Sequence, residues 1–305
     1  MTSANPACSL ALSRNDAMAG APRFAVALPS DDSSTALALA RSHGELVLAF
    51  KRRADATVID RLFQSGCLKA RFTAPQGRHA GDAILLNTAG GLTGGDRLAI
   101  SVHWGRGTSA LVTGQASEKI YRRSMGVARI ATTISLESGA AGEWLPQETI
   151  LFDRAALDRE TAIHLAPDAR FLGLEAVVLG RTAMGETVKE GQLREAWRIW
   201  RGDKLIYADA LELKGPIAHS LQHRAITGGA IAFATLLWID PDCGARLDDI
   251  RAGLAAADGH AGASFWNGMI AIRLLAPDGA CLRRDIVRAL KILRPERPLP
   301  PLWQC

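Results

Sequence analysis

The most unusual part of this chain reads NTAGGLTGGDRLAI at residues 87–100 and, after a turn, LVTGQASEKIYRR at 111–123. Two glycine pairs, Gly90-Gly91 and Gly94-Gly95, stand four residues apart and lead into Asp96. Glycine adopts a positive φ without penalty and lets another part of the chain approach closely. Because an apolar run precedes the glycines and a strand-like run beginning at Arg97 follows them, we predict a sharply folded loop between two strands.

The second half of this stretch places polar side chains directly after an apolar pair, at the end of an expected strand. They are Gln115, Ser117, Glu118, Lys119 and Tyr121. Alternation along a strand would put Lys119 and Tyr121 on one face and Glu118 on the other. One interpretation is an acid/base cluster. The interpretation that we favour is a buried tyrosine and a paired lysine that end a strand.

Downstream of the loop, a weak internal repeat indicates stacked β-structure. Ser101–Trp104, Thr133–Leu136 and Ala162–Leu165 are each strand-like, and each is followed by a short polar turn and a second apolar run. They recur at about thirty residues, a spacing that is typical of stacked repeat architectures. We therefore predict a mainly β fold with a β-helix-like, solenoid-like stack of strands. The alternative is a chance similarity between unrelated hairpins.

Stacking would bring equivalent positions of successive units together. Gln115, Gln147 and Glu175 come at corresponding strand ends. We therefore expect these three side chains to form one polar edge, and side chains on opposite sides of a sheet would contradict this.

The rest of the chain divides into an arm and a β domain. Residues 1–41 are rich in Ala, Ser, Asp and Pro without a sustained period, so we predict a mobile N-terminal arm. Residues 42–305 are predicted to form a single β domain. Helical spacing of apolar residues predicts a few helices toward the C-terminus, at about 246–257 and 282–293. We expect Pro277-Asp278-Gly279 to form a turn before the second helix.

Composition excludes several classes of protein. The 305 residues are 48 % hydrophobic and 22 % charged with a formal net charge of +5, and the basic residues are spread along the chain, which does not indicate nucleic-acid binding. The five cysteines contain no CxxC pair, which argues against a disulfide framework and a thiolate zinc site. No run approaches the roughly 20 apolar residues of a membrane span. We expect a cytoplasmic protein with reduced thiols.

The familiar catalytic and cofactor motifs do not match. The glycine-rich loop lacks the spacing and the following helix of a phosphate-binding loop, and the sequence has neither GxSxG nor HExxH. His219 and His223 would share one face of a helix as a metal pair, but we favour a structural or surface role. We interpret 144–148 as a structural corner, in which Pro146 interrupts strand pairing and Gln147 satisfies backbone groups.

Five blocks of this sequence, in order, resemble one family, the urease accessory protein UreD, called UreH in some organisms. The blocks are AGGLTGGDRL at 89–98, LVTGQASEKIYRR at 111–123, EWLPQETILF at 143–152, LGRTAMGE at 179–186, and the C-terminal part from about 263 through LKILRP to the final PPLW. Two features depart from the family: a longer arm before Arg41, and Gly114 and Ser117 where other small or polar residues are more frequent.

The resemblance implies a protein that is not an enzyme. It implies a scaffold that, in a hetero-oligomeric complex with UreF and the GTPase UreG, delivers nickel into apo-urease in the cytoplasm. It implies no tightly bound cofactor and a nickel ion that is held only in transit. Oxygen ligands suit such a role because thiolates and imidazoles would hold nickel more tightly.

On this basis we expect the glycine-rich loop to fix Asp96 and Arg97, and Gln115, Lys119 and Tyr121 to line the adjacent strand. Transient nickel contacts are predicted at four carboxylates: Asp96, Glu148, Glu175 and Glu186. The proline-rich tail and an exposed Trp303 are predicted to dock a partner, since aromatic residues anchor interfaces. Partner binding also predicts a large exposed apolar patch.

A rival hypothesis from another class is a β-solenoid hydrolase acting on a polysaccharide. Such an enzyme needs carboxylates that face one groove at separations of about 5–10 Å. Asp96, Glu148 and Glu175 are the only set that we can offer, and carboxylates on separate faces would exclude this hypothesis.

Overall fold

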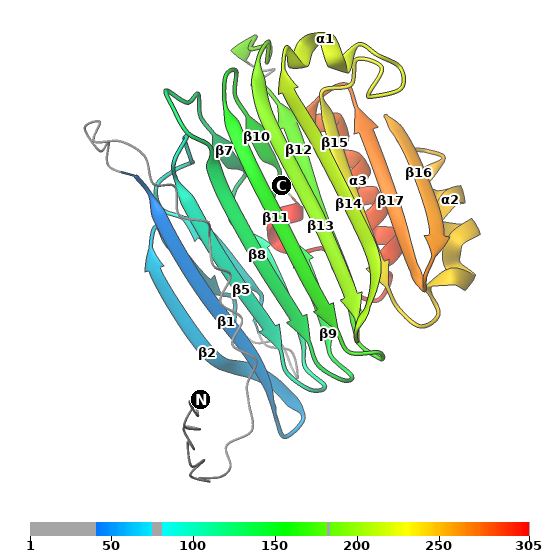
Figure 1. The fold of residues 1–305 in the computed structure, drawn as a ribbon. Helices are drawn as coiled ribbons and strands as arrows, with labels where there is room; N and C mark the ends of the chain where they lie inside the picture. Colours follow the sequence, from blue (N-terminus) through cyan, green and yellow to red (C-terminus); the bar gives the residue numbers. More distant parts are fainter. Residues whose placement is uncertain (1–40, 75–80, 182–183, 305) are drawn as a thin grey trace, which may run out of the picture.

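The computed structural model describes residues 41–74, 81–181 and 184–304. The predicted mobile arm therefore lies outside the described residues, except for Arg41. The chain is mainly β (Figure 1), with the strands β1 (His43–Arg53), β2 (Ala56–Gly66), β3 (Leu68–Phe72), β4 (Ala83–Asn87), β5 (Arg97–Trp104), β6 (Ser109–Gly114), β7 (Glu118–Ile120), β8 (Ala128–Leu136), β9 (Ala141–Leu145), β10 (Thr149–Leu151), β11 (Ala156–Leu165), β12 (Arg170–Leu179), β13 (Gly191–Arg201), β14 (Lys204–Gly215), β15 (Ala232–Ile239), β16 (His260–Trp266) and β17 (Met269–Ala276).

The helices are few, and the two longer ones lie toward the C-terminus. They are α1 (Ile217–Leu221), α2 (Leu247–Leu254) and α3 (Gly279–Leu293), with short 3₁₀ turns η2 (Cys243–Arg246) and η3 (Pro301–Trp303).

Two sheets face each other across the main hydrophobic core. The first has the order β14-β13-β11-β8-β5-β1-β2, and the second has the order β16-β17-β15-β12-β9-β6-β4-β3. The chain passes from one sheet to the other and back, so that β5, β8, β11 and β13 are parallel neighbours in the first sheet, and β6, β9 and β12 are parallel neighbours in the second. Short β7 and β10 pair in parallel with each other, and β10 also pairs with β12.

The predicted solenoid-like stack is confirmed, and the register follows the repeat. Ser101 lies opposite Thr133, and Thr133 lies opposite Ala162. The polar turns stack as well, because the Gly107 N–H donates to the carbonyl of Ser138 at 3.0 Å. Successive copies of the repeat therefore form successive coils of one stack.

Period-two burial explains why these residues form strands with one face inward. In β5, Leu98, Ile100, Val102 and Trp104 are buried, whereas the intervening side chains are half-buried. This alternation is the pattern of a strand with one face on a core.

A second core lies between the C-terminal strands and two helices. Apolar residues of β12, β15 and β17 share this core with residues of α2 and α3. Helix α3 packs on β15 and β17, and α2 packs on α3 and on β16, beside which it stands in Figure 1. Both helices were predicted, but α3 begins three residues earlier than expected. Asp278 does not belong to a simple turn: it caps the helix, because its Oδ1 accepts a hydrogen bond from the Cys281 N–H at 2.8 Å.

Candidate functional site

The glycine-rich loop attaches β4 to β7. The Leu92 N–H donates to the carbonyl of Lys119, and the Tyr121 N–H donates to the carbonyl of Leu92, both at 2.7 Å. The Tyr121 hydroxyl donates to the carbonyl of Gly90 at 2.9 Å. Gly91 has φ +145°, and a Cβ there would lie 2.4 Å from the Tyr121 ring. The loop can make this close approach only with glycine at position 91.

Gly94 and Asp96 close the other end of the loop. A Cβ on Gly94 would lie 2.1 Å from the carbonyl oxygen of Met125. Asp96 is 4 % exposed, and its two carboxylate oxygens accept hydrogen bonds from the N–H groups of Ser42 and Thr93, each at 2.8 Å. Asp96 therefore holds the loop to the start of β1, and half-buried Arg97 begins β5 beside it.

A cavity of about 460 Å³ lies next to this loop. Part of its wall is apolar and includes Leu68, Leu85, Leu98, Ile100 and Ile130. The other part is polar and includes Asn87, Gln115, Ser117, Glu118, Lys119, Gln147, Thr149, Arg159 and Glu175. Gln115, Ala116 and Lys119 are exposed, so the turn between β6 and β7 forms the mouth.

The three polar residues that were expected to form one edge do come together. Gln115, Gln147 and Glu175 all line this cavity. The ladder that pairs Thr113 with Leu145 leads to Gln115 and Gln147, just past the ends of β6 and β9, whereas Glu175 lies inside β12, so the expectation of corresponding strand ends is wrong for Glu175.

Glu118 places a carboxyl group in the cavity wall. The Asn87 amide donates to its two oxygens at 3.0 and 3.2 Å. Burial raises the pKa of Glu118 from 4.5 to about 7, although this hydrogen bond and the nearby Arg159 oppose the increase. The group therefore exchanges its proton close to neutral pH.

A buried charge cluster borders the cavity. Arg159 of β11 forms ion pairs with Glu175 of β12, at 2.8 Å, and with Glu195 of β13. It also donates to the Thr149 hydroxyl at 2.7 Å. All three charged residues are buried. Burial raises the pKa of Glu175, and the charge of Arg159 opposes this increase.

Glu175 also borders a second cavity, of about 240 Å³. Its lining includes Glu195, Trp197, Asp209, Ile226, Thr227, Phe233 and Arg273. The two cavities therefore meet at the Arg159–Glu175–Glu195 cluster, which lies between them.

The corner at 146–148 is tied to α3 and the C-terminal tail. Arg283 of α3 donates to Gln147 Oε1 at 2.8 Å, to Glu148 at 3.0 Å, and to the carbonyl of Leu302 at 2.7 Å. The Gln147 amide also approaches the Leu302 carbonyl at 3.5 Å. Gln147 thus contacts a single backbone carbonyl and also lines the cavity, so its role as a purely structural corner residue stays a prediction.

The expectation of an exposed Trp303 is wrong. The side chain is 1 % exposed, its Nε1 donates to the carbonyl of Leu145 at 3.3 Å, and the Arg283 guanidinium lies 4.8 Å from its ring. Trp303 therefore anchors the tail to this protein's own second sheet. The aromatic ring is buried because the tail folds back onto β9.

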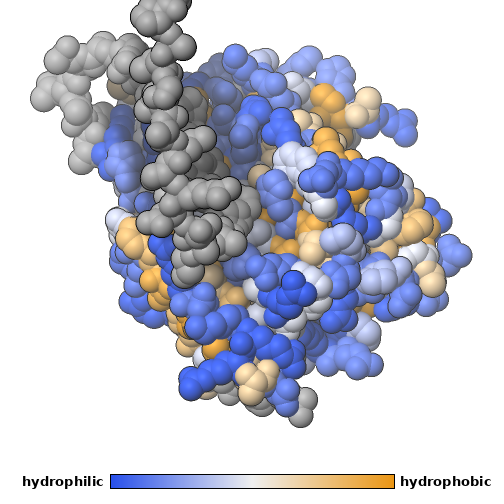
Figure 2. Space-filling view, turned by 60° about the horizontal axis from the view of Figure 1, so that its bottom comes forward, coloured by the Kyte–Doolittle hydropathy of each residue, from blue (hydrophilic) through white to orange (hydrophobic). Residues whose placement is uncertain are grey.

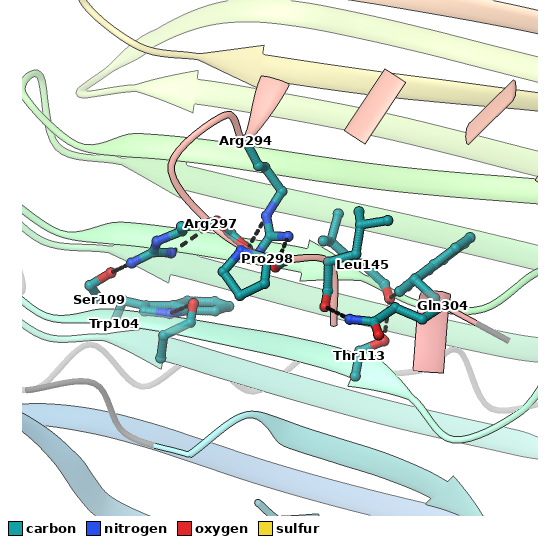
Figure 3. A network of polar contacts seen from close by, with 12 residues as sticks. Trp104, Ser109, Thr113, Leu145, Arg294, Arg297, Pro298 and Gln304 are labelled. Atoms are coloured by element: carbon teal, nitrogen blue, oxygen red, sulfur yellow. Dashed lines mark hydrogen bonds and ion pairs between the residues drawn. The ribbon is translucent and has the colours of Figure 1, made fainter. Parts of the chain in front are cut away.

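Two arginines complete the attachment of the tail (Figure 3). Arg294 donates to Glu143 at 3.0 Å and to the carbonyl of Pro298 at 2.8 Å. Arg297 donates to Glu143 at 2.9 Å and to the Ser109 hydroxyl at 2.7 Å. These contacts hold the tail against β6 and β9.

The cavity gathers some of the predicted site residues and not others. Gly90, Gln115, Lys119, Pro146, Gln147 and Glu175 line it. Gly91, Gly94, Gly95, Asp96, Arg97, Tyr121, Glu148, Glu186 and Trp303 do not line it. Tyr121, expected to be buried, is 37 % exposed and packs edge-on against Phe152. It is exposed because β7 ends at Ile120 and its ring lies over the glycine-rich loop.

Of the four predicted nickel contacts, only Glu175 lies in the cavity wall. Glu148 is bound by Arg283 and lies 3.4 Å from Ser117, which lines the cavity. Glu186 pairs with Arg181 at 2.8 Å in the segment that follows β12. The nickel contacts at all four carboxylates stay predictions.

The hydrolase hypothesis has no geometric basis in the described residues. Asp96 is engaged with the backbone of its own loop, and Glu148 is engaged with Arg283. None of the cavities found in the described parts of the chain is lined by Asp96, Glu148 and Glu175 together.

The histidine pair lies at a helix end. His219 belongs to the short α1, His223 follows it, and their rings lie 5.2 Å apart, edge to face. Within residues 41–74, 81–181 and 184–304, no three His, Cys, Asp or Glu side chains are grouped as metal ligands.

Sequence reasoning missed Arg159 and Glu195, although the sequence contained a signal. In β11, Leu157, Ile163 and Leu165 point to the core, and Arg159 occupies the same face by period two. A charged residue at an inward position of a strand indicates a paired, buried group.

Exposed hydrophobic side chains occur in several places. Among the described residues they include Ile59 and Phe63 of β2, Leu205 of β14, and Phe265 and Trp266 of β16. Figure 2 shows hydrophobic surface in separate groups among hydrophilic side chains, including a group on the left, the side on which β1 and β2 lie in Figure 1. One large apolar docking patch stays a prediction.

In the described parts of the chain, no helix has both the length and the apolar character that crossing a bilayer requires.

The fold and the site together define a β-solenoid-like protein with carboxylate-lined cavities. Comparisons with known proteins agree on a family. The family described as UreD urease accessory protein matches residues 42–304. Urease accessory protein UreD of Methylobacterium sp. (strain 4-46) is 46 % identical over 270 residues, which cover 87 % of this chain and 95 % of the relative.

Two further relatives give the same result. Urease accessory protein UreD of Rhizobium etli is 45 % identical and covers 88 % of this chain and 98 % of its own length. Urease accessory protein UreD of Sinorhizobium medicae is 44 % identical, and the match covers 89 % of this chain and 99 % of the relative. The chain therefore belongs to the UreD family of urease accessory proteins.

Proposed function

We propose that this protein is a non-enzymatic scaffold and maturation chaperone that, with UreF and the GTPase UreG, delivers nickel into apo-urease in the cytoplasm. Membership of the UreD family supports the role in urease maturation. The cavities support the delivery step, because they place oxygen ligands inside the protein.

The observation that carries the proposal is the pair of cavities that share Glu175. One cavity opens at the turn between β6 and β7, and the other lies beyond the charge cluster. A cation that enters at the mouth meets Glu118 first and then Glu175, with Gln115 and Gln147 beside them. Carboxylate and amide oxygens hold nickel less tightly than thiolates or imidazoles do, so the ion can be released.

The charge balance of the cluster together with the neighbouring Glu118 favours a cation. Three carboxyl groups, Glu118, Glu175 and Glu195, accompany one guanidinium, that of Arg159. Burial raises the pKa of Glu118 and of Glu175, so part of the excess negative charge is neutralised by protonation of these carboxyl groups. An entering divalent cation would replace those protons, and its binding would therefore strengthen as the pH rises through about 7.

The test is urease activation in cells that lack this chain, with and without extra nickel. Wild-type protein restored from a plasmid is compared with Glu175→Gln, which removes one charge and keeps the side-chain shape. Glu212→Gln, at an exposed position on β14, is the matched control. Urease activity and the nickel content of purified urease are measured.

We expect deletion to abolish activation at low nickel, with partial rescue by added nickel. Glu175→Gln should lower the nickel content of urease, while Glu212→Gln should not. Full activation in the deletion strain at low nickel would refute the proposed function. Normal nickel content with Glu175→Gln would refute the path through the cavities.

A further inference from the structure

The helical turn that follows β14 presents two histidines to solvent. Ile217 and Leu221 of α1 are buried in the main core. His219 and His223 each come two residues further along the chain, so they fall on the outer side of the same turn, and both are exposed. The His223 N–H donates to the carbonyl of Ser220 at 3.2 Å, so the chain stays tightly coiled past the end of α1 and keeps the two rings together.

The separation of the two imidazole rings suits a shared metal ion. The ring centres of His219 and His223 lie 5.2 Å apart, and the ring planes are inclined by 76°. A metal–nitrogen bond of about 2.1 Å puts a metal roughly 3.2 Å from a ring centre, so two rings on adjacent coordination positions have centres about 4.5–5.3 Å apart. The two rings therefore fit adjacent positions of one ion.

The two imidazoles are also available as ligands. In the part of the chain that the structure describes, the contact between the two rings is the only polar or ring interaction of His219 and His223. By contrast, His103 has the Ser135 hydroxyl as a partner at 2.8 Å. An imidazole without a competing hydrogen bond keeps a nitrogen lone pair free for a metal.

The histidine pair stands next to the second cavity. The Ile226 N–H donates to the carbonyl of His223 at 2.9 Å. Ile226 and Thr227 line this cavity, and Ile226 is also 42 % exposed, so the turn that His223 begins separates the cavity from solvent. Figure 1 shows α1 at the end of β14, the strand that leads into it.

Two hydrogen bonds fix this turn. The Thr227 hydroxyl and the Gly229 N–H both donate to the carbonyl of Leu221, at 2.9 and 2.7 Å. Gly229 has φ +96°, a conformation that favours glycine and lets the chain close back on α1. An ion held by the two histidines would therefore lie one closed turn away from the lining of the second cavity.

We propose that His219 and His223 together bind a nickel ion at the outer end of the second cavity, with water on the remaining coordination positions. The inference rests on the proposed function, because it takes nickel as the cation and the cavities as its path. Imidazole nitrogen suits nickel better than carboxylate oxygen does, so an ion that leaves Glu175 gains affinity at the pair. Two protein ligands leave positions open, and a ligand of a partner protein can occupy these when the ion is handed on.

The pair also gives a selectivity that the cavities lack. Carboxylate and amide oxygens suit magnesium as well as nickel, whereas imidazole suits nickel and not magnesium. A site built from His219 and His223 would therefore retain nickel in the presence of excess magnesium, and this property distinguishes it from the oxygen ligands around Glu175.

Nickel binding to the purified full chain is measured by competition with a chromophoric chelator in an excess of magnesium, which occupies oxygen ligands. The variants are His219→Gln, His223→Gln and the two combined. His43→Gln combined with His260→Gln removes two exposed histidines from the starts of β1 and β16 and is the matched control. X-ray absorption of the nickel-loaded protein counts the imidazole ligands, and thermal unfolding reports folding.

We expect the wild-type chain and the control to bind nickel through two imidazoles. Each single variant should weaken this binding about tenfold or more, nearly as much as the combined variant, because loss of one ligand removes the chelate. If the combined variant binds nickel as tightly as the control, or the two single losses are small and simply add, the shared site is refuted and the proposed function stands.

Nickel content of urease, purified from cells grown at low nickel, tests the place of the pair on the path. Several-fold less nickel with the combined variant than with the control supports the proposal. Normal nickel content with a variant that no longer binds nickel would overturn the role of the pair in delivery. Full activation without this chain at low nickel refutes the proposed function, whereas the titration of the purified chain still decides whether the pair binds nickel.

Discussion

The buried carboxyl group of Glu118 can take up and release a proton near neutral pH. Glu118 lies in a cavity wall, and burial raises its pKa from 4.5 to about 7. Its proton is therefore exchangeable at the pH at which a cation would arrive. The same burial makes the ionised group costly for the fold, so its effect is measurable as a change of stability with pH.

The free energy of unfolding should decrease as the pH rises from 4.5 to about 7. Below this window Glu118 is protonated in the folded and the unfolded chain. Within it the folded chain keeps the proton and the unfolded chain releases it, so the stabilising contribution is lost. Above it the contribution is absent. We expect Glu118→Gln to remove up to about 3 kcal/mol of this decrease.

Urea denaturation at several pH values between about 5 and 8 measures the decrease. Glu175 has its pKa raised by burial too, so part of the decrease should persist in Glu118→Gln. Glu212→Gln, which changes an exposed carboxyl, should reproduce the wild-type profile. Identical profiles for Glu118→Gln and wild type would contradict the buried, protonated state of Glu118.

Arg159 carries the only positive charge of the cluster between the cavities. Arg159→Met leaves Glu175 and Glu195 without their ion-pair partner in a buried site. We expect a loss of stability of about 3–5 kcal/mol at neutral pH. The loss should be smaller in acid, because protonated carboxyls need no counter-charge.

Denaturation curves of Arg159→Met at pH 5 and pH 8, compared with those of the exposed Arg198→Met, measure this difference. A loss for Arg159→Met that is equal at both pH values would show that packing, and not charge, accounts for the role of Arg159.

The coils of the solenoid-like stack are the elements from which the sites are built. Each coil contributes a strand to either sheet and a corner between them, and the corners at 114–118 and 146–149 lie next to each other at the cavity. The glycine-rich loop supports this edge, because Leu92 forms a parallel β-bridge with Ile120 of β7.

Alanine variants of two neighbouring glycines separate the contribution of packing in this loop from that of its backbone conformation. Gly90 has φ +75° with no atom within 4 Å of an added Cβ, so Gly90→Ala should cost about 1–2 kcal/mol for the left-handed conformation alone. At Gly91 the added Cβ also collides with Tyr121 and with the Lys119 carbonyl, so Gly91→Ala should cost about 3 kcal/mol or more.

Urea denaturation of the two alanine variants gives both values under the same conditions. Equal losses would mean that Tyr121 and β7 move away readily, and the loop would then not fix the mouth of the cavity.

The repeat made the stacking predictable because each coil reuses one pattern of strand, polar turn and strand. The turns that follow Ser101–Trp104 and Thr133–Leu136 lie in register because the two strands, β5 and β8, have nearly the same length. Contacts between segments that are far apart in the sequence could not be predicted from such a repeat. The burial of Trp303 depends on Leu145, far away in the sequence, and proline-rich composition indicates only an extended chain.

The start of α3 was predicted three residues too late for a different reason. A Pro-Asp-Gly sequence favours a turn, and an aspartate before a helix favours a cap, so the local signals are the same for both. Arg159 shows a third case, since its inward position was readable from the period of β11 and its two partners come from other strands.

At the level of the assembled protein, the C-terminal segment joins features that lie far apart in the sequence. Arg283 connects α3 to the corner at 146–148, and Arg294 and Arg297 connect the tail to β6 and β9. The tail therefore lies beside the corner at 146–148, and Gln147 of this corner lines the first cavity. A nickel ion would pass this corner if the proposed function is correct.

Closing the mouth without altering a charge separates nickel passage from assembly. Ala116 is exposed and lines the first cavity, so Ala116→Trp places a large ring at the entrance and leaves Glu118, Glu175 and Arg159 unchanged. We expect the nickel content and the activity of urease to fall several-fold at low nickel, while the complex with UreF, UreG and apo-urease still forms. Ala255→Trp, at the exposed end of α2, should leave both properties unchanged.

Nickel is measured by mass spectrometry of purified urease, and assembly by gel filtration of the four proteins together. Normal nickel content with Ala116→Trp and an intact complex would show that the ion does not enter at the turn between β6 and β7. Loss of the complex with Ala116→Trp would instead place a partner contact at the mouth.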